Sequence, residues 1–129
     1  MTKISINTLK NENIIDITDK VNEEIAKNKM TEGEIFLYLP HTTCALVVTE
    51  KTDSAYKYDF LKASKEMVKN YAFKHVGGNG EAHFKAAVFG TSRNLIVSNG
   101  KLLLGEWQGI FLVEFDGPRN REIMIKFRA

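Results

Sequence analysis

Three histidines, the only imidazoles in the chain, flank two segments whose residue types suit an anion or a metal ion. His41 ends an apolar run, His75 precedes a glycine-rich turn, and His83 follows that turn. Three imidazoles, or two with a carboxylate from Glu81 or Glu50, would suit a Zn²⁺-type ion with one open coordination position. The chain lacks HxxxH and HExxH spacing, so the fold would have to assemble the ligands. The alternative is that His41 completes a strand end while the other two histidines lie on the surface.

The glycine-rich turn "GGNG", residues 77–80, suggests a second kind of site. Its glycines permit positive φ and a close approach of the backbone to a ligand. The helix expected from Glu81 to Phe89 would present unpaired N–H groups at its start. Gly78, Asn79 and Gly80 are therefore candidates for binding a phosphate or carboxylate. The segment lacks the P-loop pattern GxxxxGK[ST], and a turn that only caps a helix at its asparagine is equally consistent.

Arg119 follows a proline in a turn, and its planar guanidinium is suited to binding an oxyanion through two hydrogen bonds. A surface arginine without a ligand is the alternative. Strand parity weakens the case for Glu50, because in one regular strand it would face away from His41. A bulge near residues 42–43 would change that. Cys44 is expected to be a small buried side chain rather than a nucleophile.

Hydrophobic periodicity predicts two clear helices and a short third one around these residues. Thr18 and Asp19 are good N-cap residues for a helix in "KVNEEIAKNKM". Asp53 is expected to cap a second helix, whose apolar stripe recurs at spacings of three and four. That stripe consists of Tyr56, Phe60, Ala63, Met67 and Tyr71. The third helix, from Glu81 to Phe89, is expected to end at Gly90.

The remaining segments predict short β-strands. Ile35, Leu37, Leu39 and His41 share one parity in "EGEIFLYLPH", and Asn99-Gly100 between two apolar runs predicts a hairpin. The stretch "EWQGIFLVEF" is apolar on both parities, which indicates a strand inside a sandwich or one covered by a partner subunit. The predicted fold is α+β: a β-sandwich of short, mostly antiparallel strands with two or three flanking helices, in one domain over residues 1–129.

Composition narrows the classes of function. The 129 residues include 18 Lys and Arg and 16 Asp and Glu, scattered without a basic block, which argues against nucleic-acid binding. No apolar run approaches the roughly 20 residues of a membrane helix, and the start of the chain lacks the apolar stretch of a signal peptide. A single cysteine cannot form an internal disulfide, so we expect a cytoplasmic protein in a reducing setting.

Three motifs, "PHTTCALVVTE", "GNGEAHFKAAVFGTS" and "GKLLLGEWQGIFLVEFDGPRNR", resemble the YjbQ-like family, whose members are mostly uncharacterised and sometimes labelled secondary thiamine-phosphate synthase. The resemblance covers essentially the whole chain. It implies a β-sandwich with helices alongside, a homotrimer, and a pocket near a subunit boundary built from histidines, acidic residues and the arginine of the DGPR turn. Matched by position, the implied pocket residues are His41, Glu50, Asp53, His75, His83 and Arg119.

The chain departs from the family pattern at two places in this implied pocket. Where the family often has N-G-H-S-H, the position two before His83 is Glu81. Where the family often has H-N-D after the second helix, this chain has His75-Val76-Gly77 and a shorter loop. A carboxylate can replace an imidazole as a metal ligand, so Glu81 would keep a site and favour harder ions. The alternative is that this change alters or removes the activity.

The resemblance suggests a transferase that joins a hydroxymethylpyrimidine pyrophosphate to a thiazole phosphate, giving thiamine phosphate. A divalent ion, Zn²⁺ or Mg²⁺, and the start of the third helix would hold the departing pyrophosphate. Arg119 would neutralise oxygen charge, His83 would be a ligand or donor, and His41 a ligand or general acid/base. The alternatives are a trimer that binds a small phosphorylated or anionic metabolite without turnover, and a metal-dependent phosphoester hydrolase.

Overall fold

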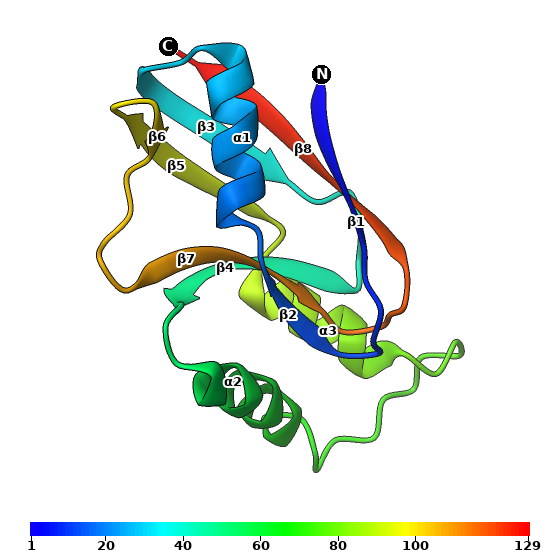
Figure 1. The fold of residues 1–129 in the computed structure, drawn as a ribbon. Helices are drawn as coiled ribbons and strands as arrows, with labels where there is room; N and C mark the ends of the chain where they lie inside the picture. The colour runs from blue at the N-terminus through cyan, green and yellow to red at the C-terminus, as the bar shows by residue number, and fades with distance from the viewer.

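The computed structural model describes all of residues 1–129 as two antiparallel sheets and three helices (Figure 1). The five-stranded sheet has the order β1-β8-β3-β5-β6, and the three-stranded sheet has the order β2-β7-β4. The strands are β1 Thr2–Asn7, β2 Asn13–Asp16, β3 Glu32–Tyr38, β4 Cys44–Glu50, β5 Ser92–Ser98, β6 Lys101–Leu102, β7 Gln108–Glu114 and β8 Asn120–Arg128. The helices are α1 Thr18–Asn28, α2 Ser54–Glu66 and α3 Gly80–Phe89. The predicted α+β class is confirmed. None of the three helices has the length and apolar character needed to cross a bilayer.

The main core lies between the two sheets and against α1. Successive side chains of a strand face opposite sides, so alternate positions point inward. The inward positions of β3, β7 and β8 carry branched aliphatic residues, and α1 adds Val21 and Ile25, which lie one turn apart. The strand members of this core include Ile35, Leu37, Ile110, Leu112, Ile123 and Ile125, none more than 2% exposed.

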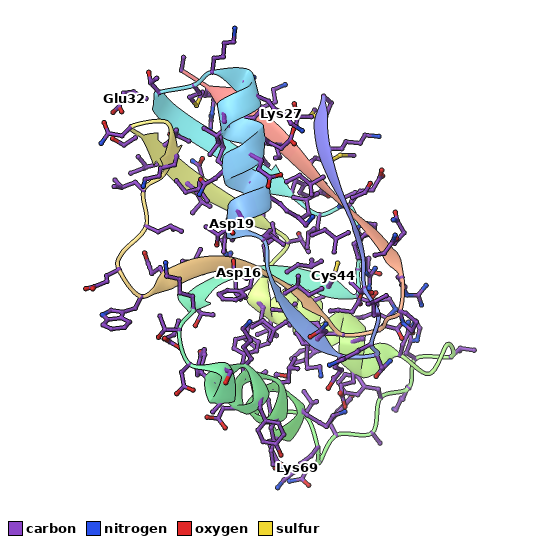
Figure 2. All side chains as sticks on the ribbon, in the orientation of Figure 1. Asp16, Asp19, Lys27, Glu32, Cys44 and Lys69 are labelled. Atoms are coloured by element: carbon purple, nitrogen blue, oxygen red, sulfur yellow. The ribbon has the colours of Figure 1, made fainter.

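Cys44 also belongs to this core, and Figure 2 shows it in the interior of the molecule. Burial raises the pKa of its thiol to about 12. The thiol therefore stays protonated at neutral pH, and a protonated thiol is a weak nucleophile. The predicted burial of Cys44 is confirmed.

β7 is buried on both faces within the single chain. Ile110 and Leu112 face the core between the sheets, whereas Phe111 faces a second cluster covered by α2 and α3. That second cluster contains Ile14, Ala45, Val47, Ala82, Ala86, Phe111, Val113 and Phe115. Of the two explanations for the apolar pattern, burial inside the molecule is therefore the correct one. Trp107 lies before the strand and is 60% exposed, so it does not continue the buried pattern.

α2 is less buried than its apolar stripe predicted. Asp53 caps the helix as expected, accepting the N–H of Ala55 at 2.9 Å. The helix ends at Glu66, and Met67 and Tyr71 are 53% and 64% exposed because the chain leaves the helix before them. The second half of the predicted stripe therefore does not pack into the core. It borders an open apolar groove of about 460 Å³, lined by Met67, Val68, Tyr71, Phe73 and Phe84.

The outer face of the five-stranded sheet carries no helix, yet several of its residues are apolar. Phe36 and Tyr38 of β3 are 38% and 44% exposed, and Ile96 of β5 is 57% exposed. Tyr38 pairs across the strands with Met124 of β8. A sheet face in contact with water normally carries polar side chains. This outer face is therefore a candidate contact surface.

Candidate functional site

A polar pocket of about 310 Å³ opens where the end of β3, the start of α3 and the β7–β8 connection meet. Figure 1 shows the β7–β8 connection passing the first turn of α3. The side-chain amide of Asn79 donates to Asp116 across this junction, at 2.8 Å. The pocket is lined by Pro40, His41, Thr42, Thr43, Asn79, His83, Arg119 and Arg121. Four of the residues singled out in the sequence therefore lie in one place: His41, Asn79, His83 and Arg119.

His41 is held in one tautomer by the backbone of β8. Its Nε2 atom accepts the N–H of Glu122 at 3.0 Å. A ring nitrogen that accepts carries no hydrogen, so the hydrogen of the neutral imidazole is on Nδ1. Burial and the nearby positive charge of Arg121 lower the pKa of His41 below its ordinary value. At neutral pH His41 is therefore an uncharged hydrogen-bond donor to the pocket.

His83 has the opposite arrangement. Its Nδ1 atom lies 3.3 Å from the carbonyl oxygen of Thr42, which can only accept, so Nδ1 donates. In the neutral imidazole the Nε2 atom then carries the free lone pair. His75 packs its ring against His83, with centroids 4.7 Å apart, but does not line the pocket. Its own Nδ1 accepts the N–H of Gly77 at 3.1 Å.

Arg119 is fixed by the turn that carries it. Its Nε donates to the carbonyl of Asp116 at 2.7 Å, and its Nη2 donates to the Asp116 carboxylate at 2.9 Å. Thr8 accepts the backbone N–H of Arg119 at 2.9 Å. Gly117 allows this packing, because a Cβ there would collide with the carbonyl oxygen of Lys10. The Nη1 group of Arg119 has no partner within the chain.

Arg121 is a pocket residue that the sequence analysis missed. It is 3% exposed, and its Nε donates to Glu114 Oε1 at 2.8 Å while its Nη2 contacts the second carboxylate oxygen. Nη2 also donates to Thr43 Oγ1 at 2.7 Å. Glu114 is fully buried and accepts a further bond from Thr8 at 2.8 Å. As in Arg119, the Nη1 group keeps no partner within the chain.

The electrostatics of this buried pair favour the charged state of both partners. Burial raises the pKa of Glu114, but the hydrogen bonds from Arg121, the Asp116 N–H and Thr8 outweigh it, and the pKa lies below the ordinary value. The pKa of Arg121 is raised, because its bonds and charge interactions with Glu114 outweigh its own burial. The guanidinium that reaches the pocket is therefore permanently charged and held in place by a fully buried carboxylate.

Comparison with known proteins identifies the family of this chain. The model of the family described as "UPF0047 protein YjbQ-like" matches residues 2–129. The chain belongs to this family. It is 41% identical over 125 residues to UPF0047 protein MJ1081 of Methanocaldococcus jannaschii, covering 96% of this chain and 91% of that protein. It is 39% identical to UPF0047 protein YugU of Bacillus subtilis, covering 95% of each chain.

Solved structures of YjbQ-family proteins share the fold. A protein of the yjbq/upf0047 family from Clostridium acetobutylicum, described as an uncharacterized conserved protein, superposes with a TM-score of 0.94 at 36% identity, covering 99% of this chain and 100% of that one. A YbjQ-like protein of unknown function from Sulfolobus solfataricus superposes with a TM-score of 0.91 at 34% identity, covering 98% and 94% of the two chains.

The resemblance to the YjbQ-like family assigned Glu50 and Asp53 to the pocket. In the structure they lie at and beyond the C-terminal end of β4, away from the pocket. The pocket adjoins the start of that strand at Cys44, and six residues of extended chain place Glu50 about 20 Å away. Glu50 is occupied locally, because its carboxylate accepts the N–H of Thr52 at 2.8 Å and that of Asp53 at 3.1 Å. These hydrogen bonds, with that from the Thr52 hydroxyl first, lower the pKa of Glu50.

Glu81 occupies the position where the family pattern often has a histidine, two residues before His83. It does not line the pocket either. Its carboxylate accepts from Lys85 at 2.9 Å, one turn along α3. Lys85 is fully buried and also donates to Glu12 at 2.8 Å. Although burial raises the pKa of Glu81, the bonds and charges of Lys85 and Lys65 outweigh it and lower the pKa. The carboxylate thus stabilises a buried lysine instead of reaching His83.

The residues in place do not fit the predicted divalent-metal site. No group of three or more His, Cys, Asp or Glu side chains in the chain is arranged to hold an ion. Of the predicted imidazole ligands, His41 and His75 each use the lone pair of one ring nitrogen to accept a backbone N–H. The only imidazole lone pair left to bind a metal ion is that on Nε2 of His83. One free lone pair is too few for a zinc or magnesium site. We therefore derive no metal-dependent step from this pocket.

Within the glycine turn, only Asn79 reaches the pocket. It occupies the N-cap position of α3, but its side chain bonds Asp116 instead of the first helical N–H groups. Gly78 has φ of 80°, a conformation that favours glycine. Gly80 allows residues 73–75 to lie close to the first residue of α3, because a Cβ there would lie 2.9 Å from Phe73. The glycines therefore shape the turn that presents Asn79 and His83.

Proposed function

We propose that this pocket binds the phosphoryl or other oxyanion group of a small metabolite. The observation that carries the proposal is the arrangement of the two arginines. Arg119 and Arg121 both line the pocket. Each uses Nε and Nη2 to bind a carboxylate or backbone oxygen, and each leaves Nη1 without a partner in the chain. His41 adds a neutral Nδ1–H donor. Donors held in place before binding lose little freedom when an anion arrives.

The reaction we propose first is the transfer that the YjbQ resemblance suggests, formation of thiamine phosphate. The bond between the pyrimidine methylene carbon and the pyrophosphate oxygen would break, with its electron pair leaving on pyrophosphate. The thiazole nitrogen would form the new bond to that carbon. Arg119 and Arg121 would stabilise the charge that develops on the departing oxygens, a role suited to fixed guanidinium groups. No proton transfer is required for this exchange.

Binding without turnover is the second candidate function, because the donor set alone is sufficient for it. The pocket offers several fixed hydrogen-bond donors, from Arg119, Arg121 and His41, that can hold an anion without any chemical step. An anion sensor needs no more than this. Incubating the purified protein with the two thiamine precursors and measuring thiamine phosphate and pyrophosphate by chromatography separates the two candidates. Product formation supports the transferase, whereas saturable binding without product supports the sensor.

Replacing Arg119 by glutamine is expected to weaken pyrophosphate binding by about 10- to 100-fold. The variant loses a charge-assisted hydrogen bond, worth about 1.5–3 kcal/mol. Isothermal titration calorimetry with pyrophosphate, repeated in the presence of EDTA, measures the effect and shows whether an ion is needed. The matched control is Arg128→Gln, which removes the same charge at the far end of β8. Equal affinities for both variants and the unaltered protein would contradict the proposed role of Arg119.

For assembly we propose the homotrimer implied by the resemblance, with the outer face of the five-stranded sheet as the contact surface. Phe36 and Tyr38 lie exposed on this face. The face also borders the pocket, because β3 leads from Tyr38 to His41, and His41 accepts the N–H of Glu122 on β8. A neighbouring chain bound to this surface would therefore lie next to the pocket.

The substitution Phe36→Glu is expected to convert the trimer to a monomer, because it places a charge in a desolvated contact. Light scattering coupled to size-exclusion chromatography measures the mass. Phe84→Glu is the matched control, since Phe84 is also exposed but lies on α3. A trimer that persists in Phe36→Glu, or dissociates only in Phe84→Glu, would show that another surface forms the contact.

A further inference from the structure

The pocket contains one imidazole lone pair beside two arginines and His41, which can only donate. The amide of Asn79 is held by its bond to Asp116, with its oxygen beside Gly77. Arginine has no acceptor atom, and the hydrogen-bond network gives His41 a hydrogen on the ring nitrogen that has no partner in the chain. His83 differs, because its Nδ1 must donate to the carbonyl of Thr42. Neutral His83, which lines the pocket, therefore keeps one acceptor, Nε2, without a partner in the chain. The hydroxyl groups of Thr42 and Thr43 rotate to suit either role and cannot discriminate.

We propose that His83 makes this pocket selective for an oxyanion that itself carries a proton, such as hydrogen phosphate or hydrogen pyrophosphate, over sulfate. The inference rests on the proposed oxyanion binding and adds a substrate class to it. Arg119 and Arg121 attract any anion of suitable size, because their interaction depends on charge and geometry. The hydrogen-bond acceptor on His83 adds a requirement that charge alone does not supply.

Phosphate and sulfate form a suitable pair of probes. At about pH 8, inorganic phosphate is mostly a dianion with one O–H. Sulfate has the same charge and nearly the same shape but no hydrogen. The O–H of phosphate can donate to Nε2. Sulfate has no hydrogen to donate, so its oxygen lone pairs and the lone pair on Nε2 repel each other. A site that hydrogen-bonds a ligand hydroxyl disfavours an analogue lacking it, here by roughly 10- to 100-fold.

The experiment measures dissociation constants for inorganic phosphate and sulfate by calorimetry at this pH, in four forms of the full-length protein. The unaltered protein is expected to favour phosphate by at least roughly 10-fold. His83→Asn retains an amide near Nδ1 but has no atom at the Nε2 position, so the ratio should fall close to one. His83→Gln reaches the Nε2 position and should restore part of the preference. His75→Asn alters the neighbouring ring outside the pocket and should keep it.

The outcomes separate this inference from the function on which it rests. Equal affinity for the two anions in the unaltered protein, or an unchanged preference in His83→Asn, overturns the selectivity and leaves oxyanion binding intact. Failure of phosphate, pyrophosphate and sulfate all to bind overturns both. If His83→Asn binds neither anion, the ratio in His83→Gln decides: a retained preference supports the role of the acceptor, and a lost one contradicts it.

Discussion

Replacing Glu114 by alanine is expected to destabilise the protein by about 3–5 kcal/mol and to abolish oxyanion binding. The carboxylate is fully buried and holds Arg121, which is 3% exposed, through bonds to both of its oxygens. Without it, a guanidinium charge remains in the interior with only the oxygens of Thr43 as partners. Urea denaturation followed by circular dichroism measures the free energy of unfolding, and calorimetry with pyrophosphate measures binding.

Two variants test whether the effect comes from the buried charge. Glu34→Ala breaks an exposed pair with Arg128, whose atoms lie 2.8 Å apart, and should cost less than about 1 kcal/mol. Adding Arg121→Met to Glu114→Ala removes the unpaired charge, so stability should largely return while anion binding does not. A loss for Glu114→Ala no larger than that for Glu34→Ala would contradict the importance of the buried pair.

The same pair gives the stability a defined pH dependence. The pKa of Glu114 in the folded protein lies below its ordinary value, so the unfolded chain binds the proton at higher pH than the folded one. The stabilisation is therefore complete above the unfolded pKa, about 4.3, and is lost as the pH falls through the folded value. Glu114→Gln should show a shallower loss of stability on this acid side.

The sequence was informative where one local pattern determines the structure. The alternation in β3, the N-cap at Asp53 and the third helix all follow from short-range chemistry, and each lies close to its predicted position. Residue types also pointed to His41, His83 and Arg119, which come from three separate elements of the fold. That they line one pocket depends on the contacts between the β3–β4 loop, α3 and the β7–β8 connection, which no local pattern contains.

The other differences arise from long-range contacts. Arg121 shares the parity of Ile123 and Ile125 in β8, so it points to the apolar side of its strand. A charged residue at such a position signals a buried partner, and this was the available sequence signal for the Glu114 pair. Glu81 could not be assigned from sequence, because its direction depends on the buried Lys85 and on Glu12, far away in the chain. The apolar stripe predicted for α2 is only partly buried, because the helix ends at Glu66 and the later stripe residues Met67 and Tyr71 are exposed.

The substitution Phe111→Asp is expected to prevent folding. Phe111 is fully buried between β7 and the helices α2 and α3. Removing a buried phenylalanine ring costs about 3–5 kcal/mol, and an unpaired carboxylate in the same place adds several more. Because small domains are stable by only about 5–15 kcal/mol, the folded state should not be populated. Circular dichroism and a thermal melt measure the loss of structure and of the cooperative transition.

Trp107→Asp is the matched control, because Trp107 lies four residues before Phe111 but is 60% exposed. It should retain a cooperative melt with a change of about 1 kcal/mol or less. The comparison also distinguishes the two explanations for the apolar pattern of this strand. If a partner subunit covered Phe111, Phe111→Asp would give a folded monomer. Because the cover comes from α2 and α3 of the same chain, the substitution should remove the fold itself at every protein concentration.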